Sequence, residues 1–489
     1  MEFHRLGFPL FLLGVFVASA IVNKSRNARN LVLLLASYAF YSYADPKYTL
    51  LLAAVTIIAF VGAPFLSAAR TGNRKLTLAV LITIELSGLA FFKYFDFAAG
   101  SINSLLASFG SGAPLPILHV AAVAGVSFYT FQAVGYLIDV YRGEVEPERD
   151  FLAFALFVGF FPQLLAGPIG RAKILLPQWK AQPDVNDSVI STGTFLILSG
   201  ALKKILIGDF LGTRLVNPAF GYPTGIGAPG VLLGTYGFAF QLYGDFAGYS
   251  EMAAGSARIF GIHLPINFNA PYRARNLTDF WNRWHISLST WIRDYVFLPI
   301  SGRNPSRARS LISAIVSMTL CGLWHGASFA WIGWGFIHGV GLAIHQTFVA
   351  SLRKRFALKK KLDKSTPFRA VSILVTFHFC CIGLFLVRGG DPVLQGVASA
   401  SEAYGKLRIM CSELLQMPRG EGMFFLNTTV IVAFLLAIAS HAFPGTWKLK
   451  LADAWRATPR IAQGAFLAIT VLLLYIVRPN VSPFIYTNF

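Results

Sequence analysis

Two histidines lie in segments rich in aromatic and basic residues. His325 occurs in CGLWHG (Cys321 to Gly326), and His285 occurs in DFWNRWHISLSTWIRDY (Asp279 to Tyr295). A neutral imidazole can act as a general base near neutral pH, so either ring could take the proton of an acceptor hydroxyl group. Nothing near His325 in the sequence would solvate it, whereas His285 is expected on an aromatic, basic amphipathic helix at the cytoplasmic surface. In both cases a hydrogen-bonded structural role is the alternative.

The other polar residues near these histidines suggest an anion site and disfavour a metal site. Arg283 and Arg293 carry guanidinium groups, which bind phosphates and carboxylates well. His338 follows His325 by thirteen residues, which is a rotation of about 220° in a continuous helix, so the two rings would face opposite sides unless the helix breaks at Gly326. No third ligand stands at a suitable spacing, and we expect no metal.

Two aspartates lie within apolar runs. Asp245, in QLYGDFAGYSE, is expected either to form a buried ion pair with an arginine such as Arg283 or Arg293, or to contact substrate. Asp139 lies close to the end of its run, where an interfacial charge is ordinary.

The composition indicates the kind of protein that holds these groups. The chain has 489 residues, of which 55% are hydrophobic and 13% charged, and its net charge is +20. Soluble domains carry about 25% charged residues. The basic residues cluster between long apolar runs, which is typical of a membrane protein and not of a nucleic-acid binder. The four cysteines have no metal or disulfide-scaffold spacing.

Apolar runs long enough to span a bilayer recur along the chain, and we expect about ten to twelve membrane-embedded helices. The strong candidates are Leu6 to Val22, Tyr48 to Ala69, Leu76 to Phe92, Leu115 to Val140, Val231 to Ala254, Ser310 to Leu323, Ala330 to Val349, Ala370 to Val387, Met423 to Ala442 and Ile461 to Val477. Asn30 to Tyr43 is short, and Lys203, Lys204 and Asp209 interrupt Val189 to Leu211.

The distribution of cations predicts the orientation. The first run precedes its positive cluster, so we expect a retained span and not a cleaved signal. Because Lys and Arg are retained in the cytoplasm, the N-terminus is expected outside, with the Gly/Ser-rich loop around Ala99 to Pro114 also outside. The clusters expected in the cytoplasm are Lys24 to Arg29, Arg70 to Lys75, Arg303 to Arg309, Arg353 to Lys364 and Lys448 to Arg460.

One apolar segment has cations on both flanks. Phe151 to Ile169 follows Arg142 and Arg149 and precedes Arg171, and its glycines and prolines would break a helix. A simple crossing would place one cationic flank outside. Broken backbone at membrane depth is tolerated where protein or a water-filled cavity covers it. We therefore expect a re-entrant segment that lines a central cavity.

Several long motifs occur in an order that resembles the membrane-bound O-acyltransferase (MBOAT) family, and within it the membrane subunits of bacterial alginate O-acetylation. The motifs are SFYTFQAVGYLIDVYRG from Ser127, FFPQLLAGPIGR from Phe160, DFWNRWHISLSTWIRDYVFLPI from Asp279 and GLWHGASFAWIGWGFIHG from Gly322. The resemblance implies one all-α, polytopic membrane domain over residues 1–489, most motif-rich at 127–345 and followed by C-terminal helices at 370–489. It also implies a ring of helices around a central funnel.

The resemblance further implies an acyltransferase of the bacterial inner membrane, with His325 and His285 as its two histidines. The acetyl donor would be a cytoplasmic thioester such as acetyl-CoA, with Arg283 and Arg293 as candidates for its phosphates. The acetyl group would pass to a periplasmic esterase-like partner that modifies an exported polysaccharide such as alginate. Alternatives are peptidoglycan or cellulose as acceptor, and D-alanyl or longer acyl groups. A transporter or glycan flippase would be a different class, but we find no inverted halves.

Overall fold

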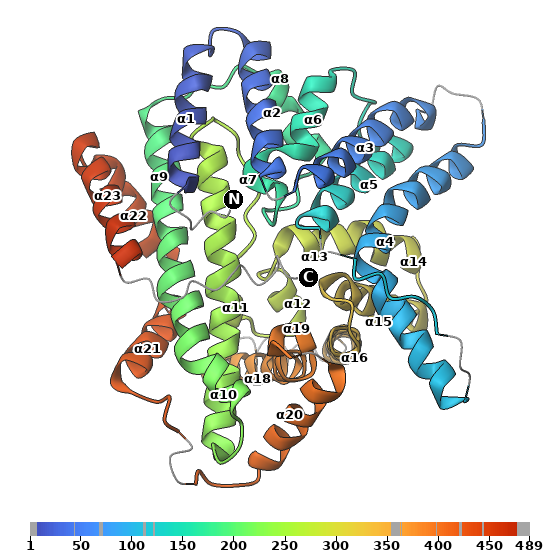
Figure 1. Cartoon of the computed structure of the whole chain (residues 1–489), viewed down its shortest axis with the longest axis vertical. Coiled ribbons are helices and arrows are strands. Elements are labelled where there is room, and N and C mark those ends of the chain that lie inside the picture. The colour runs from blue at the N-terminus through green and yellow to red at the C-terminus, as the bar shows by residue number, and fades with distance from the viewer. Residues whose placement is uncertain are drawn as a thin grey trace. The chain divides into compact units, whose positions relative to one another are not determined.

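The computed structural model describes residues 7–43, 45–67, 72–110, 114–120, 123–353, 362, 364–397, 399–419, 423–442 and 445–476. Within these ranges the chain is helical and contains no β-strand, which confirms the all-α prediction. Figure 1 traces the helices in chain order. Contacts group them into two compact units, which are described separately; the expectation of a single domain stays a prediction.

Unit 1 holds the described residues of Met1–Ser199 and Tyr249–Pro265. Its helices are α1 (Gly7–Ile21), α2 (Arg26–Ser42), α3 (Pro46–Gly62), α4 (Arg74–Ser108), α5 (Val126–Arg142), α6 (Phe151–Gly159), α7 (Phe161–Leu164), α8 (Ala172–Lys180) and most of α9 (Asp187–Leu202).

Unit 2 holds the described residues of Gly200–Gly248 and Ile266–Ile485. Its helices are α10 (Asn217–Gly221), most of α11 (Gly227–Arg258), α12 (Leu277–Trp281), α13 (Ile286–Ile292), α14 (Leu298–Ser301), α15 (Arg307–His325), α16 (Phe329–Arg353), α18 (Thr366–Gly390), α19 (Pro392–Gln395), α20 (Ala400–Glu413), α21 (Thr428–Ala442), α22 (Gly445–Ala457) and α23 (Arg460–Ile476). Wider π-helical turns occur at Lys203–Asp209, Gly212–Val216 and Arg293–Phe297.

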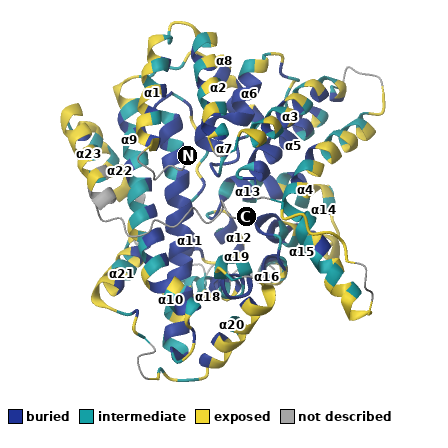
Figure 2. Ribbon diagram, in the orientation of Figure 1, coloured by how far each residue is buried: buried dark blue, intermediate teal, exposed yellow. Residues whose placement is uncertain are grey.

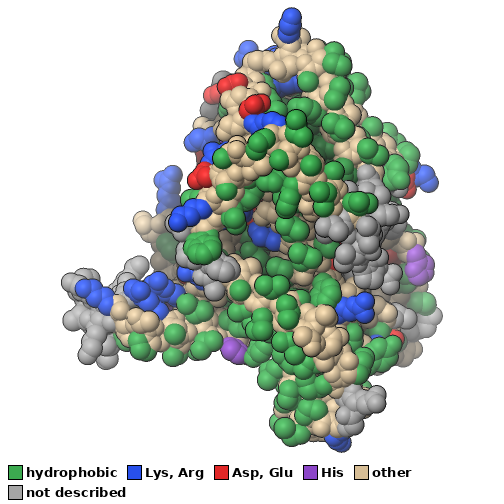
Figure 3. Space-filling model, turned by 90° about the vertical axis from the view of Figure 1, so that its left-hand side faces the viewer, with side chains coloured by type: hydrophobic (Ala, Val, Ile, Leu, Met, Phe, Trp, Pro, Cys, Tyr) green, Lys and Arg blue, Asp and Glu red, His purple; other side chains and the backbone are tan. Residues whose placement is uncertain are grey.

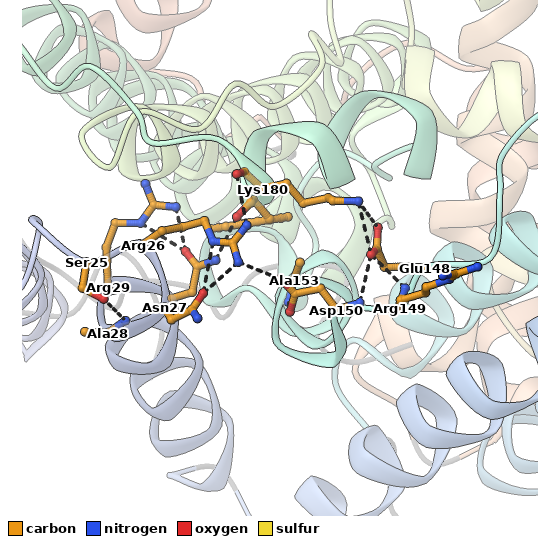
Figure 4. A network of polar contacts seen from close by, with 12 residues as sticks. Ser25, Arg26, Asn27, Ala28, Arg29, Glu148, Arg149, Asp150, Ala153 and Lys180 are labelled. Atoms are coloured by element: carbon orange, nitrogen blue, oxygen red, sulfur yellow. Dashed lines mark hydrogen bonds and ion pairs between the residues drawn. The ribbon is translucent and has the colours of Figure 1, made fainter.

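The segment predicted to be re-entrant forms a broken hairpin in unit 1. The chain enters through α6, turns at α7 and returns through α8. Its two ends meet, because Lys180 forms an ion pair with Glu148 (3.3 Å) and Arg26 contacts both Asp150 (3.3 Å) and the Lys180 carbonyl (3.2 Å), as Figure 4 shows. The segment therefore enters and leaves at the same end of unit 1, as the paired cationic flanks predict.

Other cationic segments of unit 1 gather with this hairpin. Arg74 donates to the carbonyl of Tyr141 (2.7 Å), which precedes Arg142. The loops around residues 24–29, 74–75, 142–149 and 171–180 thus share hydrogen-bonded connections, as expected if they lie on one side of a membrane. Arg70 and most of Arg353 to Lys364 lie outside the described residues. The cytoplasmic identity of this end and the external N-terminus stay predictions.

The boundaries of two predicted spans were wrong. α4 extends over 35 residues to Ser108, although a Gly/Ser-rich loop was expected from Ala99. Serines in this extension donate to carbonyls of the preceding turn, as Ser104 does to Gly100 (2.9 Å), so their hydroxyls do not form the loop that was expected. α5 begins only at Val126 and not at Leu115, because Gly125 has a left-handed φ of 81°.

Three described helical segments are long and apolar enough to cross a membrane: Pro46–Leu66, Arg74–Ser108 and Thr366–Gly390. The helices Gly7–Ile21 and Thr428–His441 are apolar but shorter. The other predicted spans correspond to helices that are broken, shorter or less apolar. Figure 2 shows α4, α20 and α23 largely exposed and α11 largely buried, and Figure 3 shows hydrophobic side chains spread over one face. Such a surface suits lipid and not water.

In unit 2, α15 and α16 form a hairpin with very close backbone packing. A Cβ atom on Gly322 would lie 2.2 Å from the Trp331 carbonyl oxygen, and one on Gly335 would lie 2.2 Å from that of Met318. Only glycine allows this approach. The hairpin places His325 at its turn, against the start of α16.

Candidate active site

His325 is the last residue of α15. Gly326 ends the helix with an extended backbone (φ −160°, ψ 145°), and α16 starts at Phe329. The Trp331 ring occupies the space that a side chain at Gly326 would need, since a Cβ there would lie 2.1 Å from it. The same ring stacks on His325 at a centroid distance of 5.1 Å. The helix break and Trp331 together fix the imidazole, which is 2% exposed.

His285 lies in a tight turn and not on the amphipathic surface helix that was expected. α12 ends at Trp281, α13 begins at Ile286, and His285 between them has a left-handed φ of 42°. The side chain is fully buried. The helix breaks because the turn hydrogen-bonds to a neighbouring segment: Ser287 donates its backbone N–H and its hydroxyl to Asn267 Oδ1 (3.2 and 2.8 Å). No motif around Asn267 indicated this role.

The two imidazoles lie together. Their ring centroids are 6.4 Å apart with an interplanar angle of 53°. Trp324 contacts both rings, at 5.9 Å from His285 and 4.9 Å from His325, and Phe246 packs edge-on against His285 at 4.6 Å. Two residues distant in sequence are thereby brought into one aromatic cage, as a shared chemical role would require.

His338 lies beside this pair but faces other rings. Because the helix breaks at Gly326, the rotation expected for a continuous helix does not apply. The Trp334 ring packs between the His325 and His338 rings, at centroid distances of 5.2 and 4.7 Å. His345, further along α16, shares a hydrogen bond with the Thr278 hydroxyl (3.1 Å). His345 is thus held by a hydrogen bond, whereas neither ring nitrogen of the buried His338 has a hydrogen-bond partner among the described residues.

A cavity of about 210 Å³ lies near the histidine pair in unit 2, although neither His285 nor His325 is part of its wall. Its wall includes Ile286, the residue after His285, and Cys321, one helical turn before His325. Two wall atoms, Trp281 Nε1 and Ser317 Oγ, are buried and have no hydrogen-bond partner among the described residues. Buried polar groups are normally paired. These two donors have almost no exposed surface, so they point away from the cavity although their residues line it.

The two predicted phosphate-binding arginines are placed differently. Arg293 lines the cavity, with a side chain that is 58% exposed and an ion pair to the neighbouring Asp294 (2.7 Å). Arg283 is not part of the cavity wall; its Nε pairs with Asp279 at 2.6 Å. Of the two, only Arg293 has access to a ligand in the cavity.

The two aspartates differ from expectation. Asp245 pairs with Lys204 (2.5 Å) and not with an arginine, and Lys204 also contacts Asp209 (2.6 Å). This cluster lies where the π-helical turn Lys203–Asp209 meets α11, so the charges that interrupt the predicted span are paired. Asp139, expected at the interface, is 5% exposed on α5 in unit 1.

Comparison with known proteins matches the part of the chain that holds this site. Residues 147–387 match the model of the membrane-bound O-acyltransferase family. The chain is 37% identical over 357 residues to the probable alginate O-acetylase AlgI of Pseudomonas aeruginosa, covering 71% of this chain and 66%, just under two thirds, of that protein. It is 30% identical over 529 residues to the peptidoglycan O-acetyltransferase of Helicobacter pylori (98% and 95% covered). It is 32% identical over 285 residues to the teichoic acid D-alanyltransferase of Bacillus subtilis (56% and 70% covered).

Proposed function

Because this chain belongs to the membrane-bound O-acyltransferase family and is an O-acyltransferase, we propose that it moves an acetyl group from a cytoplasmic thioester toward an exported polysaccharide. The observation that carries the proposal is the pairing of His285 and His325 in one aromatic cage close to a cavity. The sequence left a transporter or glycan flippase as an alternative. Because the chain belongs to an acyltransferase family, the acyltransferase function is proposed in its place.

In the proposed reaction, His325 is the general base. Its imidazole takes the proton of an acceptor hydroxyl, and the oxygen attacks the thioester carbonyl. The C–S bond breaks, and the leaving thiolate takes the proton back from the imidazolium. His285 orients or assists from the other side of the cage. General acid–base catalysis of this kind contributes about 10²–10⁴-fold in rate.

The cavity suits an acetylated thiol carrier such as acetyl-CoA. An acyl-pantetheine arm is a chain of carbonyl and amide groups on an apolar backbone, and it needs hydrogen-bond donors as well as apolar wall. Asn282 and Gln346 place amide groups in the wall, and Met318 and Leu342 provide apolar surface. Arg293 lies at the wall where a phosphate could be bound. Arg283 is a weaker candidate because it is not part of the cavity wall.

The acceptor is proposed by analogy with the relatives. Similarity to an alginate O-acetylase favours an exported polysaccharide, with a periplasmic esterase-like partner completing the transfer. The H. pylori relative, matched over nearly the whole of both chains, makes peptidoglycan the second candidate. Similarity to a D-alanyltransferase keeps D-alanyl transfer as a third. The proposed location is the bacterial inner membrane, with the N-terminus outside.

Mass spectrometry of the exported polymers separates these candidates. Exopolysaccharide, peptidoglycan and teichoic acid would be isolated from cells with and without the gene, and from cells that express the His325→Ala variant. We expect O-acetyl groups to disappear from the exopolysaccharide in the two deficient strains and the other polymers to be unchanged. Loss of D-alanyl ester or of peptidoglycan acetylation instead would reject the proposed acceptor.

A further inference from the structure

One face of α15 forms part of the cavity wall and leads to His325. The wall includes Ala314, Met318 and Cys321, at spacings of four and three residues, so these side chains share one face of the helix. The next residue on this face is His325, four positions after Cys321. His325 itself is not part of the wall. On this side the cavity therefore ends at Cys321, one helical turn before the imidazole.

α13 lines the cavity in the same way. Its face and the π-helical turn after it contribute Ile286, Ser289, Thr290 and Arg293 to the wall, again at helical spacing. Ile286 directly follows the buried His285, whereas Arg293 lies two turns, about 10 Å, further along the helix. The side chain of Arg293 is 58% exposed. The cavity thus has an accessible end at Arg293 and an inner end near the histidine pair.

Aromatic rings fill the space between this inner end and His325. The rings of Trp324, Trp331 and Trp334 lie 4.9, 5.1 and 5.2 Å from the His325 ring, centroid to centroid. A thioester whose carbonyl carbon reaches the imidazole must therefore fit its acyl chain between the inner end of the cavity and these rings. Because protein interiors are close-packed, this space suits a short acyl chain.

The charge of the wall bears on which short acyl group fits. None of the described residues that line the cavity is acidic, and Arg293 is the one basic residue among them. Its partner Asp294 (2.7 Å) lies outside the wall. A D-alanyl group carries an ammonium, and a buried ammonium needs a carboxylate partner. The wall therefore disfavours an aminoacyl group and accepts an uncharged one.

We propose that Ile286 and Cys321 are specificity-determining residues, which restrict the acyl donor to a short, uncharged acyl group such as acetyl. This restriction rests on the proposed acyl transfer at His325 and adds to it the class of acyl group. The Cys321 thiol, close in size to a methyl group, closes the inner end of the cavity. One extra or missing methylene in an apolar pocket changes discrimination by about 10–200-fold. Removal of the sulfur should therefore admit a longer chain.

Binding of acyl-pantetheine thioesters to the purified full chain tests the proposal without turnover. The probes are the acetyl, butyryl, isobutyryl and D-alanyl thioesters, of which the last two are similar in shape and differ in charge. The variants are Cys321→Ala, Cys321→Ser, which keeps the size of the side chain, and Ile286→Val, which removes a methyl group from the same end. Cys380→Ala is the matched control, because Cys380 is a buried cysteine on α18 that does not line the cavity. Titration calorimetry in nanodiscs measures the affinities.

We expect the wild type, Cys321→Ser and Cys380→Ala to bind the acetyl probe about tenfold or more tightly than the butyryl and isobutyryl probes. In Cys321→Ala this ratio should fall by about tenfold, because the inner end is enlarged. Ile286→Val should shift the ratio in the same direction, so the test does not depend on one variant. The D-alanyl probe should bind weakly to every protein, including Cys321→Ala.

These measurements separate the selectivity of the cavity from the proposed function. An unchanged ratio in both Cys321→Ala and Ile286→Val, or an equal change in Cys380→Ala, would overturn the proposal. Tight binding of the D-alanyl probe by the wild type, or failure of every probe to bind, would overturn it too. If the wild type prefers the acetyl probe as expected but releases no thiol from acetyl-CoA, the selectivity stands and the proposed acyl transfer fails.

Discussion

His285 and His325 are held by different backbone conformations. His325 ends a regular helix, whereas His285 adopts a left-handed conformation that non-glycine residues rarely adopt. Such strain costs about 1–3 kcal/mol and tends to cluster at functional sites. The fold accepts it at His285 because Asn267 and Ser287 fix the turn.

His285→Asn tests the role of this ring. Asparagine tolerates the left-handed conformation, so the turn should remain while the imidazole is lost. We expect at least a hundredfold lower kcat for acyl transfer and a folded protein by size-exclusion chromatography. His263→Asn, at an exposed histidine in unit 1, is the control and should keep normal activity. Undiminished kcat in His285→Asn would show that the ring is only structural.

At this scale the sequence identified both histidines but not their surroundings. The aromatic residues around His285 and His325 in the sequence made these two histidines candidates, and their rings lie close together in the structure. The pairing of Asp279 with Arg283 could have been predicted, because their spacing of four residues favours a helical ion pair. Neither Asn267 nor the Lys204–Asp245 pair could be predicted, since long-range packing alone creates these contacts.

At the scale of elements, the α15–α16 hairpin positions His325. Its two helices approach so closely that Gly322 lies against the backbone of α16. A backbone atom of α16 cannot shift to make room for a larger side chain as a flexible side chain could. The helix does break at Gly326, the alternative to a continuous helix that the sequence left open. The same reasoning failed for α4, which continues through the predicted loop, and for α5, which starts only after a left-handed glycine.

Gly322→Ala and Gly333→Ala form a matched pair on this hairpin. A Cβ atom on Gly322 would meet the Trp331 carbonyl, whereas nothing lies within 4 Å of one on Gly333. We expect Gly322→Ala to lose about 1–3 kcal/mol of stability through overpacking, and Gly333→Ala to gain about 0.5–1 kcal/mol through helix propensity. Melting curves followed by tryptophan fluorescence measure both. Equal melting temperatures would contradict the close packing.

At the scale of the whole molecule, charge and hydropathy predicted most of the features that could be predicted from the sequence. They indicated an all-α membrane protein, and the cations on both flanks of Phe151 to Ile169 indicated a segment that doubles back, as α6 to α8 do. That this segment re-enters a membrane stays a prediction. Three described helical segments are long and apolar enough to cross a membrane on their own, and the other expected membrane-embedded helices are broken, shorter or less apolar. Identity of the acceptor polymer depends on partners outside this chain.

The central claim is that the His325 imidazole acts as the general base in acyl transfer. The rate of thioester cleavage tests this claim most directly. Purified wild-type protein and the His325→Gln variant would be given acetyl-CoA with an acceptor polysaccharide and the periplasmic partner, and release of free thiol would be followed. The account predicts at least a hundredfold slower release by the variant, with unchanged abundance and melting temperature. Thiol release by His325→Gln at the wild-type rate would contradict it.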